Sequence, residues 1–224
     1  ITPFDTGAYA SRQSYVSGMA AKKAAIVMKE KIIQHASFML KLPTSNLDIK
    51  DDNIIAKDNG EILASLKEVA LHAIYNTEKS IHITAEVTSQ CKSNTFSFGV
   101  CFADVEVDIP VGKIKVNKII NVHDCGRLLN PALAEAQVHG GMSMGLGFAL
   151  SEQMLFDEKT GKPLNNNLLD YKLPTIMDTP HLEAQFAQTY DVSGPFGNKS
   201  LGEPPAVPVA PAIRNAVFNE IGRA

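Results

Sequence analysis

One alternating stretch decides the fold of this chain: Phe96-Ser97-Phe98-Gly99-Val100-Cys101-Phe102-Ala103-Asp104-Val105-Glu106-Val107-Asp108. Apolar and polar side chains exchange at almost every residue, which is typical of a β-strand with one face on a core and the other in water. After a turn at Pro110-Val111-Gly112, a second alternating segment at 113–122 runs back. The two segments predict an antiparallel hairpin. Asp104, Glu106 and Asp108 share its wet face by parity, and we expect that face to be solvated rather than to bind a metal.

Downstream of the hairpin the sequence predicts a helix that begins at Pro131, with Asn130 as its cap. Each glycine inside that helix would cost about 1 kcal/mol relative to alanine. The helix nevertheless contains four of them, Gly140, Gly141, Gly145 and Gly147. So many glycines indicate that something packs very close to the helix, either another helix or a ligand. A strand at 182–189 and a closing helix at 208–221 complete this part.

Upstream, spacings of three and four apolar residues predict a long amphipathic helix from Tyr15 to about Leu40. Two short strands are expected within 43–65, and a helix capped by Ser65 should follow, with Glu68 completing a capping box. His72 fits a half-buried residue of that helix better than a metal ligand. Residues 81–88 alternate and predict one more strand. The irregular mixture of strands and helices indicates an α+β fold, and the two parts predict lobes at about 1–90 and 91–224.

Composition excludes several classes of protein. The chain has 224 residues, 45% of them apolar, and a net charge of −3. It has no basic block, so we expect no nucleic-acid partner. No apolar run reaches the roughly 18 residues that span a bilayer, so we expect no membrane association. Cys91, Cys101 and Cys125 show no CxxC spacing, which favours free thiols in the reducing cytoplasm. Both ends lack the signals of a natural terminus, and we interpret the chain as a piece of a larger polypeptide or assembly.

The polar loop at residues 5–14 precedes the long helix and is a candidate phosphate site. Its serines offer hydroxyls, the helix start offers unpaired N–H groups, and Arg12 would add a cation. The same residues also fit an ordinary N-cap, and the loop alone does not decide between the two interpretations.

The candidate catalytic residue is Glu203, within Gly197-Asn198-Lys199-Ser200-Leu201-Gly202-Glu203-Pro204-Pro205. Gly202 allows another group to approach the backbone closely, and the two prolines fix φ and remove two amide donors. A carboxylate on so restricted a backbone is held in place before anything binds, as a general base requires. The alternative is a surface turn that happens to contain an acid.

Four segments, in this order, resemble the molybdenum-binding part of the xanthine dehydrogenase/aldehyde oxidase family of molybdenum hydroxylases. They are Gly7–Arg12; Phe102–Asp108 running on to His123–Arg127 and Asn130-Pro131; Gln137 with Gly140-Gly141 and Gly145–Leu150; and Tyr171–Thr175 with Lys199–Pro205. Each match is weak alone, but together they are collinear over nearly all of the chain. The resemblance implies the second, C-terminal half of a molybdopterin-binding domain, similar to the bacterial members with separate subunits.

That resemblance implies a specific chemistry. Molybdenum is held by the dithiolene of a pterin, so no protein metal ligand is expected. Glu203 matches the family's base, which deprotonates a metal-bound hydroxyl that attacks an electron-poor carbon while hydride passes to the molybdenum centre. The implied substrates are N-heteroaromatics such as purine or nicotinate, or aldehydes or thioesters. The residues implied to line the path of the cofactor are Ala10, Ser11, Arg12, Gln13, Ser14, Asp124, Cys125, Gln137 and Gly202.

The resemblance also implies partners. The remaining half of the molybdopterin domain, a 2Fe-2S chain and a flavin (FAD) chain would complete a hetero-oligomer. The separate-subunit type favours the cytosine dinucleotide form of molybdopterin. The rival interpretation is a non-catalytic assembly subunit, and the presence of Glu203 counts against it.

Overall fold

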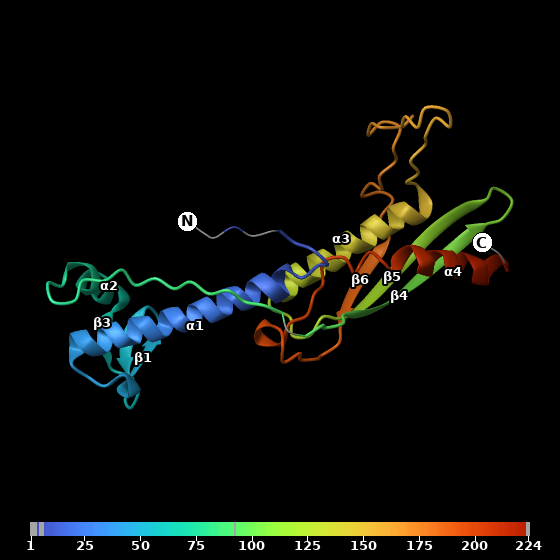
Figure 1. The fold of residues 1–224 in the computed structure, drawn as a ribbon. Helices are drawn as coiled ribbons and strands as arrows, with labels where there is room; N and C mark the ends of the chain where they lie inside the picture. Colours follow the sequence, from blue (N-terminus) through green and yellow to red (C-terminus); the bar gives the residue numbers. More distant parts are fainter. Residues whose placement is uncertain (1–3, 5–6, 92, 223–224) are drawn as a thin grey trace. The chain divides into compact units, whose positions relative to one another are not determined.

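The computed structural model describes residue 4 and residues 7–91 and 93–222, which fall in two compact units (Figure 1). The first unit contains residues up to Val16 together with those from Cys91 onward. The second contains Ser17–Gln90. The long helix α1 (Gln13–Leu40) begins in the first unit and continues in the second. None of the helices in the described ranges is long and apolar enough to cross a membrane.

The first unit is built on a three-stranded sheet of order β4-β5-β6. β4 (Phe98–Asp108) and β5 (Lys113–Asp124) form the predicted antiparallel hairpin, and β6 (His181–Phe186) pairs with β5 in parallel. Helices α3 (Pro131–Leu150) and α4 (Val209–Ile221) pack on one face of this sheet, α3 against β6 and α4 against β4 (Figure 1). The core between sheet and helices consists of Val116, Ile119, Val138, Met142, Leu146, Val209 and Ile213.

The local signals read from the sequence of this unit are confirmed. The Asn130 side chain accepts a hydrogen bond from the Leu133 N–H at 3.1 Å and so caps α3. Asp104, Glu106 and Asp108 are exposed on the face of β4 that the helices do not cover. Phe98, Val100 and Phe102 share that exposed face at the other end of the strand.

The second unit has a small antiparallel sheet of order β1-β2-β3. Two strands were predicted here, and the structure has three because a four-residue strand directly precedes the capped helix. The elements after α1 are η1 (Thr44–Asn46), β1 (Leu47–Lys50), β2 (Asn53–Ala56), β3 (Ile62–Ser65) and α2 (Leu66–Tyr75). Ala36, Leu47, Ile54, Ala64 and Val69 form a separate core.

Two further predictions in the second unit are confirmed. The Ser65 side chain accepts from the Glu68 N–H, and the Glu68 carboxylate accepts from the Ser65 N–H, which completes the capping box. His72 is half-buried on α2, and its Nδ1 lies 2.9 Å from Nε2 of His35.

The prediction of a strand at residues 81–88 is wrong. Residues 81–90 are extended and alternate between half-buried and exposed, but no strand pairs with them. They are held by isolated contacts instead: Ile81 N–H donates to Ala73 O at 2.7 Å, and Lys31 Nζ donates to Thr84 O at 2.6 Å. The alternating pattern therefore reflects a half-buried extended segment that does not belong to a sheet.

Candidate active site

Glu203 is exposed, yet one side chain holds it from two directions. The Ser11 hydroxyl donates to Glu203 Oε2 at 2.7 Å and accepts from the Glu203 N–H at 2.6 Å. Ser11 has a left-handed backbone with φ of 57°. A single hydroxyl thus fixes both the backbone and the carboxylate of the predicted base. The predicted orientation of this carboxylate comes from Ser11 as well as from the two prolines that follow it.

Gly202 is the point where the loop before Glu203 meets its neighbours. A methyl group at this position would lie 3.0 Å from Cβ and Oγ of Ser11, so a larger residue would push the serine away. The Gly202 carbonyl accepts a hydrogen bond from Gln137 Nε2 on α3 at 2.6 Å. The loop is therefore held from the N-terminal segment and from α3 at once.

A second loop, which follows β5, pairs with the segment that leads to Glu203. The Arg127 N–H donates to Gly197 O at 2.9 Å, and the Lys199 N–H donates to Cys125 O at 2.7 Å. Gly126 lies between these bonds with φ of 69°, and a side chain there would collide with Gly197 O. Only glycine lets the two loops approach this closely.

An ion pair joins the same two loops. Lys199 Nζ lies 2.6 Å from Asp124 Oδ2, with 9% of the lysine side chain and 20% of the aspartate side chain exposed. Lys199 also donates to Phe96 O at 3.0 Å, and the Thr189 hydroxyl donates to Asp124. Burial alone would raise the pKa of Asp124, but hydrogen bonds from Lys199, Thr189 and the Gly126 N–H outweigh it and hold that pKa below its usual value.

Cys125 is buried beside this pair. Burial raises the pKa of its thiol, and the charge of Asp124 raises it further. The thiol is therefore protonated at neutral pH and has the character of a buried contact rather than of a reactive nucleophile.

A pocket of about 390 Å³ lies beside these loops at the start of α3. It is lined by six of the residues predicted to contact a cofactor, Ser11, Gln13, Ser14, Cys125, Gln137 and Gly202. Ala10, Arg12, Asp124 and Glu203 lie outside its lining, although each is adjacent in sequence to a lining residue. The sequence reasoning did not select Asn198 and Lys199, which are both buried and line the pocket. Their position inside the Gly197–Pro205 stretch was the available signal.

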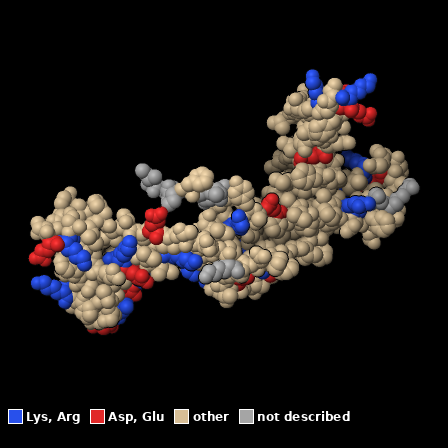
Figure 2. All heavy atoms as spheres, viewed as in Figure 1, with Lys and Arg blue, Asp and Glu red and all other residues tan. Residues whose placement is uncertain are grey.

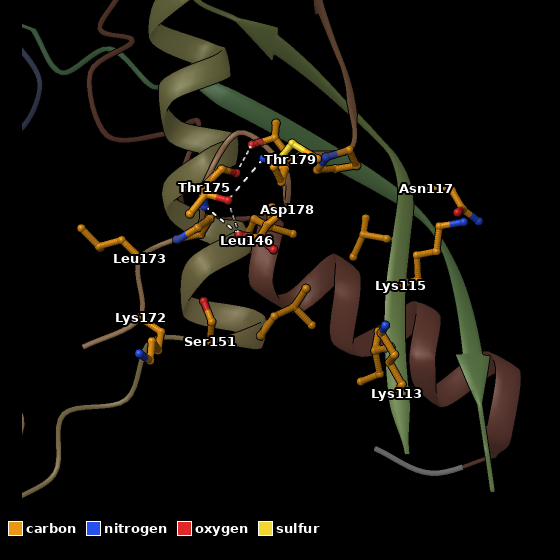
Figure 3. Close-up of a pocket in the computed structure, with 16 residues that line it drawn as sticks. Lys113, Lys115, Asn117, Leu146, Ser151, Lys172, Leu173, Thr175, Asp178 and Thr179 are labelled. Carbon is orange, nitrogen blue, oxygen red and sulfur yellow. Dashed lines mark hydrogen bonds between the residues drawn. The ribbon is translucent and has the colours of Figure 1, made fainter. Parts of the chain in front are cut away.

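A larger groove of about 940 Å³ lies at the opposite end of α3 (Figure 3). The start of β5 lines it with Lys113, Lys115 and Asn117, and the segment 172–180 forms another wall. The carboxylate of Asp178 is engaged there by the Thr175 N–H at 2.8 Å and the Thr175 hydroxyl at 2.7 Å. None of the predicted site residues lines this groove.

A pocket at a helix start, lined by hydroxyl, amide and apolar side chains beside an oriented carboxylate, is the kind of site that suits a cofactor-binding domain. The chain belongs to the molybdopterin cofactor-binding domain family, whose sequence profile matches residues 1–180. The resemblance to molybdenum hydroxylases of the xanthine dehydrogenase type is thereby confirmed.

Individual relatives agree with this assignment. The chain is 50% identical over 218 residues to the putative xanthine dehydrogenase molybdenum-binding subunit XdhA of Escherichia coli, covering 97% of this chain and 29% of that protein. It is 31% identical to the carbon monoxide dehydrogenase large chain of Hydrogenophaga pseudoflava, covering 97% of this chain and 27% of the relative.

Solved structures show the same fold. Cu,Mo-CO dehydrogenase superposes with a TM-score of 0.85 at 29% identity, covering 98% of this chain and 28% of that one. Quinoline 2-oxidoreductase from Pseudomonas putida 86 gives a TM-score of 0.84 at 26% identity, covering 96% of this chain and 28% of that one. The chain spans less than a third of the length of these relatives.

Proposed function

We propose that this chain forms part of the molybdenum-pterin site of a hydroxylase, with Glu203 as the general base. The substrate would be an electron-poor carbon of an N-heteroaromatic such as purine or nicotinate, or of an aldehyde, and water would supply the oxygen. The observation that carries the proposal is the Ser11–Glu203 clamp beside a pocket lined by six of the predicted cofactor residues.

The residues that line the pocket suit a pterin cofactor that carries phosphate. Gln13 and Ser14 open α1, and the start of a helix is the end whose dipole favours an anion. Arg12 would add a cation next to them, and Ala10 would contribute backbone. Cys125 and Gln137 would meet the ring edges, and Asp124 would hold the Cys125 loop through Lys199. When bound, the cofactor supplies an oxidising molybdenum centre, held by its own dithiolene.

Glu203 would take up the proton released as the substrate carbon is attacked. Its Oε2 already accepts from Ser11, so we expect Oε1 to receive that proton. The Ser11 hydroxyl would keep the carboxylate in one orientation through the reaction, and the Gln137–Gly202 bond would hold the loop that carries it. General-base assistance of this kind typically contributes 10²–10⁴-fold to the rate.

The proposal extends to the surroundings of the chain. We infer the cytosine dinucleotide form of molybdopterin, 2Fe-2S and FAD on partner chains, the remaining half of the molybdopterin domain as a neighbour, and a location in the cytoplasm. The support is the resemblance to separate-subunit enzymes, a relative named as a molybdenum-binding subunit, and three free cysteines. Mass spectrometry of the cofactor released from the purified complex would identify both metal and nucleotide, and a form without a nucleotide would contradict the inference.

Glu203→Gln tests the central residue. Glutamine keeps the size and hydrogen-bonding shape of the side chain but cannot accept the proton, so the assembled complex should retain molybdenum and pterin. Its kcat should fall by at least about a hundredfold, because the lost interaction acts mainly in the transition state. The measurement is the rate of metal reduction by substrate at matched molybdenum content.

Glu135→Gln is the matched control, because Glu135 is an exposed glutamate of α3 outside the pocket lining. It should reduce its metal at the wild-type rate. If Glu203→Gln also does so, Glu203 is not the base. A complex that binds cofactor but turns over none of the candidate substrates, with or without Glu203, would support the rival interpretation of a non-catalytic assembly subunit.

A further inference from the structure

Asn121 is a buried amide on the core face of β5. It is 0% exposed and lies two residues along the strand from the core residue Ile119, on the same face. Polar groups normally stay at the surface, as the lysines and acidic residues visible in Figure 2 do. Burial of an amide costs free energy unless the group finds hydrogen-bond partners. The position of Asn121 therefore needs a physical reason.

The amide of Asn121 makes one directed contact. Its Nδ2 donates to the Pro205 carbonyl at 2.8 Å, two residues after Glu203. Its Oδ1 is buried and has no hydrogen-bond partner among the described residues. A buried polar atom without a partner is unfavourable for stability. An apolar residue would avoid that cost, so the one bond to Pro205 is the feature that distinguishes asparagine here. Local departures of this kind are expected where a site requires them.

The segment between Pro205 and Glu203 is stiff. Only Pro204 separates the two residues, and each proline ring fixes φ. The Ala206 N–H donates to Glu203 O at 3.0 Å and closes a turn over these residues. Gly141 of α3 confines the turn from another side, because a methyl group there would lie 2.6 Å from Pro205 Cβ. A displacement of the Pro205 carbonyl would therefore be passed on to Glu203.

The strand that carries Asn121 is a rigid support. β5 is the central strand of its sheet, with β4 antiparallel on one side and β6 parallel on the other (Figure 1). Asn121 is paired with Cys101 of β4 and with Ala184 of β6. Sites held by side chains of regular elements are more precise than sites held by loops alone.

We propose that Asn121 is a positioning residue for Glu203 and acts through the Pro205 carbonyl. The inference rests on the proposed function, in which Glu203 is the general base. Ser11 holds the N–H and the carboxylate of Glu203, and Asn121 holds the backbone that follows it. Without the bond from the sheet the turn would sample more orientations, and a misplaced catalytic group lowers the rate.

Asn121→Leu tests the bond, because leucine has a similar size and no donor. In the assembled complex kcat should fall about tenfold. KM and the content of molybdenum and pterin should stay at the wild-type values, since Asn121 does not line the 390 Å³ pocket. Asn117→Leu is the matched control, the same substitution on the same strand at a half-buried residue that lines the groove at the opposite end of α3. It should leave kcat unchanged, and equal losses in the two variants would overturn the assignment.

A double variant separates the positioning of Glu203 from a general loss of structure. Added to Glu203→Gln, Asn121→Leu should change the rate of metal reduction by less than about twofold, because the base through which it acts is already absent. A further loss of about tenfold would overturn the inference. The same measurements keep two failures apart. Glu203→Gln at the wild-type rate contradicts the proposed function, whereas a slow Glu203→Gln beside an unchanged Asn121→Leu contradicts the positioning alone.

Asn121→Asp is the conservative variant, and it decides the question if Asn121→Leu does not assemble. Burial raises the pKa of a carboxyl group at such a position, and the neutral form can donate to the Pro205 carbonyl as the amide does. The ionised form cannot donate and repels that carbonyl. The ratio of kcat in Asn121→Asp to kcat in wild type should therefore be near one in acid and fall as pH rises.

The groups around Asn121 leave this pH response readable. Burial raises the pKa of the Cys101 thiol, opposite on β4, to about 11. Burial lowers the pKa of His123, two residues along β5, so both groups are uncharged at neutral pH. Ala184, opposite on β6, has no ionisable group. Division by the wild-type value removes the titration of Glu203 itself. A ratio that is low at every pH, or that does not fall as pH rises, would overturn the inference.

Discussion

At the scale of single residues, Lys199 determines how the two loops of the site meet. Its ammonium group is almost fully buried and lies against the Asp124 carboxylate at 2.6 Å. Lys199→Met removes the cation and leaves a partly buried carboxylate without its partner, which costs about 3 kcal/mol at neutral pH. Urea unfolding of the chain measures the loss. Lys113→Met, at an exposed lysine of β5, should change the stability by less than about 0.5 kcal/mol.

The loss of stability in Lys199→Met should depend on pH, because it acts through the ionised carboxylate of Asp124. The folded pKa of Asp124 is depressed, so its contribution to stability is fully present above the unfolded value of about 3.9 and is lost as pH falls through the folded value. Wild type and Lys199→Met should therefore differ most at neutral pH and converge in acid. A difference that stays constant down to acid pH would show that Lys199 stabilises the loops by packing and not through Asp124.

The contacts of Glu203 show what a sequence can and cannot reveal about a site. The position of Glu203 between Gly202 and two prolines predicted a restricted backbone from neighbouring residues in the sequence alone. The group that orients its carboxylate is Ser11, 192 residues away. No local pattern pairs positions so distant, so these two segments were connected only through the family resemblance. Asn198 and Lys199 lie inside the stretch that the sequence singled out, but their place in the pocket depends on the pairing of that stretch with the loop at 124–127.

At the scale of elements, predictions succeeded where the signal lies in backbone chemistry and failed where it depends on a neighbour. Asn130 before Pro131 and Ser65 before Glu68 each identified a helix start, because a cap satisfies N–H groups of its own helix. The alternation at 81–88 predicted a strand, and the structure has a segment there whose residues alternate between half-buried and exposed without pairing. It could not predict whether another strand would lie beside it, since pairing depends on residues elsewhere in the chain.

The capping box of α2 supplies a prediction at this scale. Ser65→Ala removes the side-chain acceptor of the Glu68 N–H and should destabilise the second unit by about 1 kcal/mol. Hydrogen exchange at the first amides of α2 should quicken in proportion, because fraying begins at the uncapped end. Thr88→Ala, at an exposed position of the same unit, should leave that exchange unchanged. Equal effects of the two substitutions would mean that the box does not determine where α2 begins.

At the scale of the whole molecule, each unit has a core that shares no residue with the other. The candidate pocket and Glu203 both belong to the first unit. In this chain Glu203 and the outer face of α3 are exposed to water. The sequence patterns predicted lobes at about 1–90 and 91–224, and in the folded chain the residues up to Val16 group with those from Cys91 onward, because such grouping depends on contacts between segments distant in sequence.

The last prediction is that this chain by itself will not turn over substrate, even after incubation with molybdenum cofactor. The remaining half of the molybdopterin domain is proposed to complete the pocket, so in this chain alone water reaches Glu203 and the cofactor would be held from one side only. Exclusion of water strengthens the electrostatic contacts on which a general base depends, and an open site loses that gain. The electron acceptors are proposed to lie on partner chains, so a single reduction could not become a cycle. Anaerobic assays with xanthine, nicotinate and an aldehyde, with a soluble dye as acceptor, should give no steady rate for the chain. A chimera of the E. coli relative, in which this chain replaces the matched residues, should turn over when assembled with the partner subunits of that relative. Because the dye replaces the natural acceptors, steady turnover by the chain alone would show that its pocket is already complete, and that would contradict the proposal that the remaining half of the domain completes it.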